Sequence, residues 1–135
     1  MSNPVFEAQT AIFKALTSSS SFTSTGAALY DTPPDNSAYP YVCVDNTNVR
    51  KMNRHSKKGW GIYLTLGIYT NPGLLGSYQM ENIYSAIDDV VNLNRFDLES
   101  SDLYMTKITE VGNSSIRNSE IYTKALTYDI IIFKD

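Results

Sequence analysis

The chain has 135 residues, of which 42% are hydrophobic and 19% are charged, and its net charge of −3 corresponds to an isoelectric point of about 5.0. This length predicts one domain, residues 1–135, with a core that needs no disulfide or structural metal, and the single cysteine excludes an internal disulfide and a cysteine-built zinc site. The acidic balance gives no general reason to expect nucleic-acid binding, and no apolar run approaches the ~20 residues that cross a bilayer. The N-terminus lacks the pattern of a signal peptide, so we expect the protein to stay in a reducing cytoplasm and not to meet a membrane.

The first residues predict a helix. Asn3 is a capping residue, and Pro4 follows at the first helical position, where its missing N–H group costs nothing. Apolar residues then recur at helical spacing: Val5, Ala8, Ile12 and Leu16. We expect the helix to end near Thr17, because residues 17–25 are mostly Ser and Thr, whose hydroxyl groups compete for backbone hydrogen bonds. Residues 26–31 (GAALYD) then predict a short strand.

Two further strands are predicted, with a polar loop between them. Residues 41–44 (YVCV) are β-branched or aromatic, and Cys43 fits there as a small buried hydrophobe. The next strand is longer, because alternate residues form one apolar face: Trp60, Ile62, Leu64, Leu66 and Ile68. Residues 45–59 are polar and predict a flexible loop that is longer than a hairpin needs.

This predicted loop is strongly basic. Five of the eleven basic residues fall within nine positions that contain no acid: Arg50, Lys51, Arg54, Lys57 and Lys58. One interpretation is a solvated hairpin loop, because charged runs usually lie on the surface. The other is a contact with an anionic surface, either phosphate or an acidic partner protein. The loop contains no aromatic residue, so base stacking of the single-strand type is not predicted.

The second half of the chain predicts one helix and two strands. After a turn at 71–73, residues 75–92 place apolar side chains at helical spacing: Met80, Ile83, Tyr84, Ile87, Val90 and Val91. Residues 103–111 predict a strand, 112–118 (GNSSIRN) a turn, and 120–134 a long final strand. The order α-β-β-β-α-β-β predicts an α+β fold, with a mostly antiparallel sheet of about five strands and two helices on one face.

The sequence carries no assembled catalytic site. His55 is the only histidine, and it lies among basic residues, where its protonation state does not suit a general base. Serine and cysteine nucleophiles need a base and an orienting group, and the chain shows no such set. The phosphate-binding and zinc-binding motifs are also absent from the sequence. We therefore expect no enzyme activity, no catalytic residue, no cofactor and no metal.

At the level of whole segments, the chain resembles the tail completion proteins of bacteriophages with long flexible tails, also called tail terminator or tail-to-head joining proteins. The resemblance rests on the short N-terminal helix at 5–16, the strand opening YPYVCV at 39–44, and the long strand GIYLTLGIY at 61–69. It continues through the helix at 75–92 to a strand close to the C-terminus, and so covers nearly the whole chain.

The resemblance implies a structural role in a virion that is assembled in the host cytoplasm. Such proteins form a homo-oligomer, a six-fold ring at the head-proximal end of the tail tube, which stops tube growth and docks the head connector. The partners expected from this resemblance are the tail tube protein, the connector or stopper protein, and DNA that passes through the lumen without sequence-specific binding. Tyr63 and Tyr69, on the non-core face of the long strand, are candidate subunit contacts, because interfaces favour tyrosine. The five basic residues would line the lumen or meet an adjoining ring.

Two other classes of function stay open from the sequence. One is a different ring-forming virion component, such as a head-closure protein or a tail tube protein. The other is a nucleic-acid-binding accessory protein that uses the basic loop, for which binding should fall steeply with salt.

Overall fold

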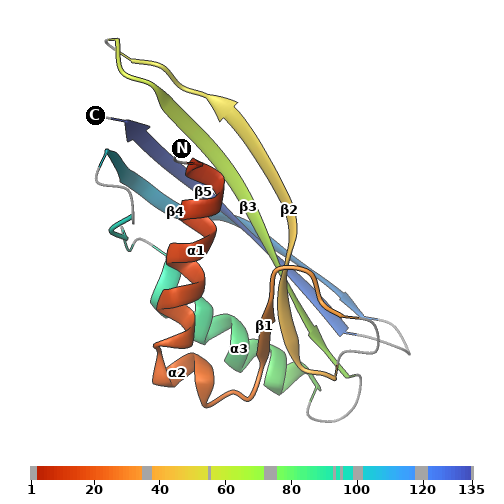
Figure 1. Ribbon diagram of the computed structural model, residues 1–135. Coiled ribbons are helices and arrows are strands. Elements are labelled where there is room, and N and C mark those ends of the chain that lie inside the picture. Colours follow the sequence, from red (N-terminus) through yellow and green to blue (C-terminus); the bar gives the residue numbers. More distant parts are fainter. Residues whose placement is uncertain are drawn as a thin grey trace.

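The computed structural model describes residues 3–34, 38–54, 56–71, 76–92, 94, 96–98, 102–117 and 122–134. Five strands form one sheet in the order β1-β2-β3-β5-β4 (Figure 1). Their bounds are β1 (Ala28–Tyr30), β2 (Tyr41–Lys51), β3 (Gly59–Thr70), β4 (Leu103–Arg117) and β5 (Tyr122–Lys134). Among the described strand pairs only β1–β2 is parallel, so the predicted mostly antiparallel α+β fold is confirmed.

The helices lie on one side of the sheet (Figure 1). They are α1 (Pro4–Thr17), the single turn α2 (Ser20–Thr23) and α3 (Gly76–Val91). As predicted, Asn3 caps the start of α1: its side-chain oxygen accepts from the N–H groups of Val5 and Phe6 at 3.0 and 3.2 Å. The turn α2 was not predicted. Ser19 caps it by accepting from the N–H group of Phe22, and burial of the Phe22 ring holds this hydroxyl-rich segment in a helical turn.

The core lies between the helices and one face of the sheet. Alternate residues of β3 supply its centre, as predicted, and are buried: Ile62, Leu64, Leu66 and Ile68. The matching residues of β5, from Leu126 to Ile132, lie on the same face, because β3 and β5 pair in register along their whole length. The other face carries no helix in the described part of the chain, and we call it the helix-free face (Figure 1).

Residues 45–51 form a strand, so the prediction of a flexible loop over 45–59 was wrong for this part. After a bulge between Val44 and Asn46, β2 continues to pair with β3 as far as Lys51 opposite Trp60. The segment is polar because, beyond the end of β1, one of its edges is open and most of its side chains are exposed. Because residues 45–51 are mostly exposed to solvent, they have the polar composition that is typical of a loop although they form a strand.

Residues 112–117 also form a strand where a turn was predicted. Gly, Asn and Ser favour turns in isolation, but here each residue has a partner on β5, from Gly112 opposite Thr127 to Arg117 opposite Tyr122. A bulge between Glu110 and Gly112 absorbs the break in alternation. The pairing with a long apolar neighbour overrides the local preference, as is common for strands.

Candidate functional site

The basic residues lie on the β2–β3 hairpin, an arm that extends past the end of α1 (Figure 1). The arm is closed by backbone hydrogen bonds, from the N–H group of Met52 to the carbonyl of Gly59 at 2.8 Å and between Arg54 and Lys57 at 3.0 and 2.7 Å. Ser56 adopts a positive φ of 68° at the turn. Arg50 and Lys51 are thus positioned by β2, and Arg54 and Lys57 by an isolated bridge between them beyond the strand ends.

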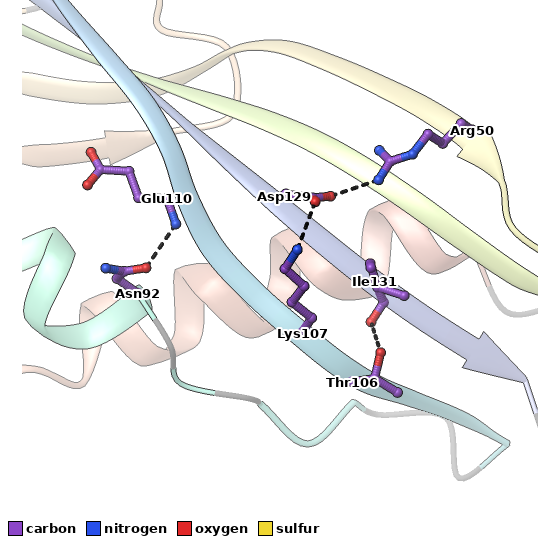
Figure 2. Close-up of polar contacts among 7 residues, drawn as sticks. All are labelled: Arg50, Asn92, Thr106, Lys107, Glu110, Asp129 and Ile131. Atoms are coloured by element: carbon purple, nitrogen blue, oxygen red, sulfur yellow. Dashed lines mark hydrogen bonds and ion pairs between the residues drawn. The ribbon is translucent and has the colours of Figure 1, made fainter.

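Arg50 is held by the sheet itself. Its Nη2 atom lies 3.1 Å from Oδ1 of Asp129, whose other oxygen lies 3.4 Å from Nζ of Lys107 (Figure 2). Asp129 is only 6% exposed, and the Arg50 guanidinium also stacks over the ring of Tyr63, 4.3 Å from its centroid. One carboxylate thus ties β2, β5 and β4 together across the helix-free face.

The other four basic side chains are exposed and divide between the two faces of the arm. Arg54 and Lys57 lie towards the helix-free face, over the rings of Phe133 and Tyr104 at 5.9 and 5.6 Å. Lys57 also donates to the Tyr104 hydroxyl at 3.4 Å.

On the other side of the arm, Lys51 and Lys58 line a hollow of about 210 Å³ together with Asn53 and Trp60. Residues 45–59 contain no aromatic residue, but β4 and β5 place the rings of Tyr104 and Phe133 next to Lys57 and Arg54. Sequence reasoning missed Tyr104 and Phe133 because they are distant along the chain.

Tyr63 and Tyr69 both lie on the helix-free face, as predicted. Tyr63 is 37% exposed, and the guanidinium of Arg50 lies over its ring. Tyr69 is half-buried, and its ring is stacked on Tyr41 with 4.9 Å between centroids. Tyr63 thus offers more free surface than Tyr69.

The Asp45 carboxylate forms hydrogen bonds with both Tyr69 and Cys43. Asp45 accepts from the Tyr69 hydroxyl at 2.7 Å and from Sγ of Cys43 at 3.4 Å. Burial and the charge of Asp45 raise the pKa of the Cys43 thiol to about 12, so it stays protonated and is a poor nucleophile. Burial and the hydrogen bond to Asp45 also raise the pKa of Tyr69.

Three glycines of β3 leave room for these side chains. A Cβ atom at Gly59, Gly61 or Gly67 would collide with Phe133, Arg50 or Asp45, respectively. All three glycines lie on the helix-free face, where each lets a side chain from a neighbouring strand lie flat across β3. All three glycines fall at the same alternate positions of the strand as Tyr63 and Tyr69, and this alternation could have placed them on the helix-free face from the sequence alone.

The described part of the chain contains no cluster of three or more side chains suited to a metal ion, and none of its helices is long and apolar enough to cross a membrane. His55 lies outside the described residues. Exposed charges, aromatic rings and open strand edges suit this surface for contact with macromolecules.

Comparisons with known proteins give a consistent result. The family model described as tail completion protein gp17 matches residues 10–132. Among solved structures, a chain from the virion of a native gene transfer agent particle superposes with a TM-score of 0.83, with 96% of each chain covered and 16% of the residues identical. A search of the curated proteins found no match.

Proposed function

Because the chain belongs to the tail completion protein gp17 family, we propose that it forms a ring at the head-proximal end of a phage tail tube, ends tube growth and joins the tail to the head connector. Family membership makes the protein a structural component of the tail of a phage-like virion. The observation that carries the proposal is the family match over residues 10–132, which includes β1 to β4, α3, and most of β5 and α1.

The β2–β3 arm is the proposed contact with a neighbouring component of the tail. The arm extends beyond the helices (Figure 1). It carries four exposed basic side chains with no acid near them in sequence: Lys51, Arg54, Lys57 and Lys58. Such a concentration of one charge favours an anionic partner surface, on the tube protein, on the connector or on DNA in the lumen. In this proposal Arg50 acts from within the sheet, by holding the arm at a fixed angle through Asp129.

DNA contact in this proposal is transient and independent of sequence. Phosphate attracts Lys and Arg without regard to base identity, and DNA must move through the lumen, so tight binding would oppose passage. Tyr63 is proposed as a contact between subunits, with Tyr69 as a support that holds Asp45 and Tyr41 in place.

Tube growth provides the direct test of termination. Tail tube protein is polymerised alone and in the presence of increasing amounts of this protein, and tube lengths are measured by electron microscopy. A terminator shortens the tubes in proportion to its concentration and leaves them unable to grow when more tube protein is added. A tube component would instead add to their length, and an unrelated protein would leave the lengths unchanged.

A second candidate function is nucleic-acid binding, which the pairing of Arg54 and Lys57 with aromatic rings at the arm favours. It predicts tight DNA binding by the free protein, with an affinity that falls steeply as salt rises. Filter binding across a salt series tests it. Terminator activity in the tube assay with weak DNA binding excludes this role as the main function.

A further inference from the structure

The sheet has two open edges. At one end of the strand order, β1 covers β2 only at residues 41–43, which leaves the outer edge of residues 45–51 without a partner strand among the described residues. At the other end, β4 pairs with β5 on one side and with no other strand that the structure describes. Open edges carry unpaired N–H and C=O groups and are templates for pairing with another chain.

The edge of β4 is covered at Glu110, near the middle of the strand, and is exposed beyond it. At Glu110, the N–H group is held by the side-chain oxygen of Asn92 at 2.8 Å, so the end of α3 covers this edge (Figure 2). Residues 111–116 are exposed along their length, and two of them are large and apolar: Val111 is 54% and Ile116 63% exposed. This segment has no charged residue, although charge is a common means of blocking an edge.

We propose that residues 111–116 of β4 in one copy pair with residues 45–51 of β2 in the next, so that the sheets of neighbouring copies join into one continuous sheet around the ring. The inference rests on the proposed ring and names the surfaces that close it. Within one chain β2 and β4 run in opposite directions, because each of the three pairings between them in the strand order is antiparallel. Copies related by rotation about the ring axis would therefore meet as an antiparallel pair. Each copy gives one edge and receives the other, which is the heterologous contact that rings require.

The strand register is compatible with closure. Asn48 on β2 pairs with Tyr63 on β3, which pairs with Asp129 on β5. Ser114 on β4 pairs with Ala125 on β5. Pairing Asn48 with Ser114 of the next copy therefore shifts each copy by the four residues from Ala125 to Asp129, about 13 Å at ~3.3 Å per residue. Four strands ~4.8 Å apart span about 19 Å, so the strands would tilt by about 35°. Closed barrels tilt their strands by ~35–45°.

The side chains suit the same register. Asn48 and Ser114 both lie on the helix-free face, so the pairing keeps the helices of all copies on one side. The register also places Asn46 opposite Ile116 and puts no two like charges across from each other. Residues 41–43 of β2, which β1 covers, then fall beyond Arg117, where β4 ends, so that β1 does not block the contact.

Disulfide trapping tests the pairing. The double variant Asn48→Cys with Ser114→Cys is assembled on tail tubes, oxidised and run on a denaturing gel without reductant. We expect a ladder of covalent multimers that ends at the size of the closed ring, because directly opposed residues have Cβ atoms ~4.5–5.5 Å apart. The matched control, Asn48→Cys with Ser115→Cys, points its second thiol to the other face and should give at least about tenfold less product. The wild-type chain, whose Cys43 is buried, should give no ladder.

The outcomes separate this inference from the proposed function. If electron microscopy shows rings on the tubes but the double variant gives no ladder, or no more than its control, the edge pairing is overturned and the ring stands. If the wild-type protein forms no rings, the proposed function fails. Because both substituted residues are exposed, the variants should fold, and an unchanged melting temperature verifies this before oxidation.

Discussion

The guanidinium of Arg50 lies directly over Gly61, so that a Cβ atom at residue 61 would stand 2.5 Å from Cζ of Arg50. The arginine cannot simply swing away, because its Nη2 atom is held by Asp129 and its plane rests on the Tyr63 ring. The absence of a side chain at Gly61 therefore lets Arg50 reach Asp129, the carboxylate that joins β2, β5 and β4.

Gly61→Ala should therefore lower the free energy of unfolding by about 1–3 kcal/mol, the usual cost of overpacking a fitted site. Gly112→Ala is the matched control, since a Cβ atom there would meet nothing within 4 Å, and it should change stability by less than about 0.5 kcal/mol. Urea denaturation measures both. If Arg50→Ala does not reduce the cost of Gly61→Ala in the double variant, the clash is not the cause.

Tyr128 and Tyr84 should respond in opposite ways to loss of the hydroxyl group. Tyr128 is fully buried, and its hydroxyl has no hydrogen-bond partner among the described residues, so Tyr128→Phe removes an unpaired polar group and should raise the free energy of unfolding by up to about 1 kcal/mol. Tyr84 donates to both oxygens of Glu110, at 3.0 and 2.8 Å, and Tyr84→Phe should cost about 1–2 kcal/mol. A loss in Tyr128→Phe as large as that in Tyr84→Phe would refute this assignment.

Asp88 should make the protein less stable as pH rises. Burial, followed by repulsion from Glu110 and Asp89, raises the pKa of Asp88 above its ordinary value of 3.8. The folded state thus holds this proton more tightly than the unfolded state, and ionisation above pH 3.8 costs folded stability until the raised pKa has been passed. Asp88→Asn should therefore gain more stability, relative to wild type, at about pH 7 than at about pH 4. Parallel curves of unfolding free energy against pH for the two proteins would contradict this origin of the cost.

Charge reversal on the arm should weaken its contact with the tail. Lys58→Glu places an acid beside Lys51 and Trp60, and reversing Lys51, Arg54, Lys57 and Lys58 together should lower affinity for the partner by about tenfold or more at low salt. Lys14→Glu, on α1, is the control for net charge and should have little effect. Co-sedimentation with tail tubes and with connector at two salt concentrations measures the difference. Equal binding by Lys58→Glu, the fourfold variant and Lys14→Glu would rule out the arm as a contact.

Sequence patterns correctly predicted the helices and strands that bury one apolar face and leave the other face more polar. The alternation from Trp60 to Ile68 and the spacing from Met80 to Val91 each face a single apolar layer, and both gave the correct element. The patterns failed at 45–51 and 112–117, because strand edges exposed to water need no apolar face and therefore resemble loops. They also could not place Asp129 under Arg50, since 79 positions separate the two residues and only the sheet register unites them.

If this protein caps the tail tube, images of tube ends should show it. Purified tubes are mixed with the protein and examined by negative-stain electron microscopy with class averaging of tube ends. We expect a ring of added density at one end of each tube and none at the other end or along the wall. Density along the wall, at both ends alike, or at neither end would contradict it.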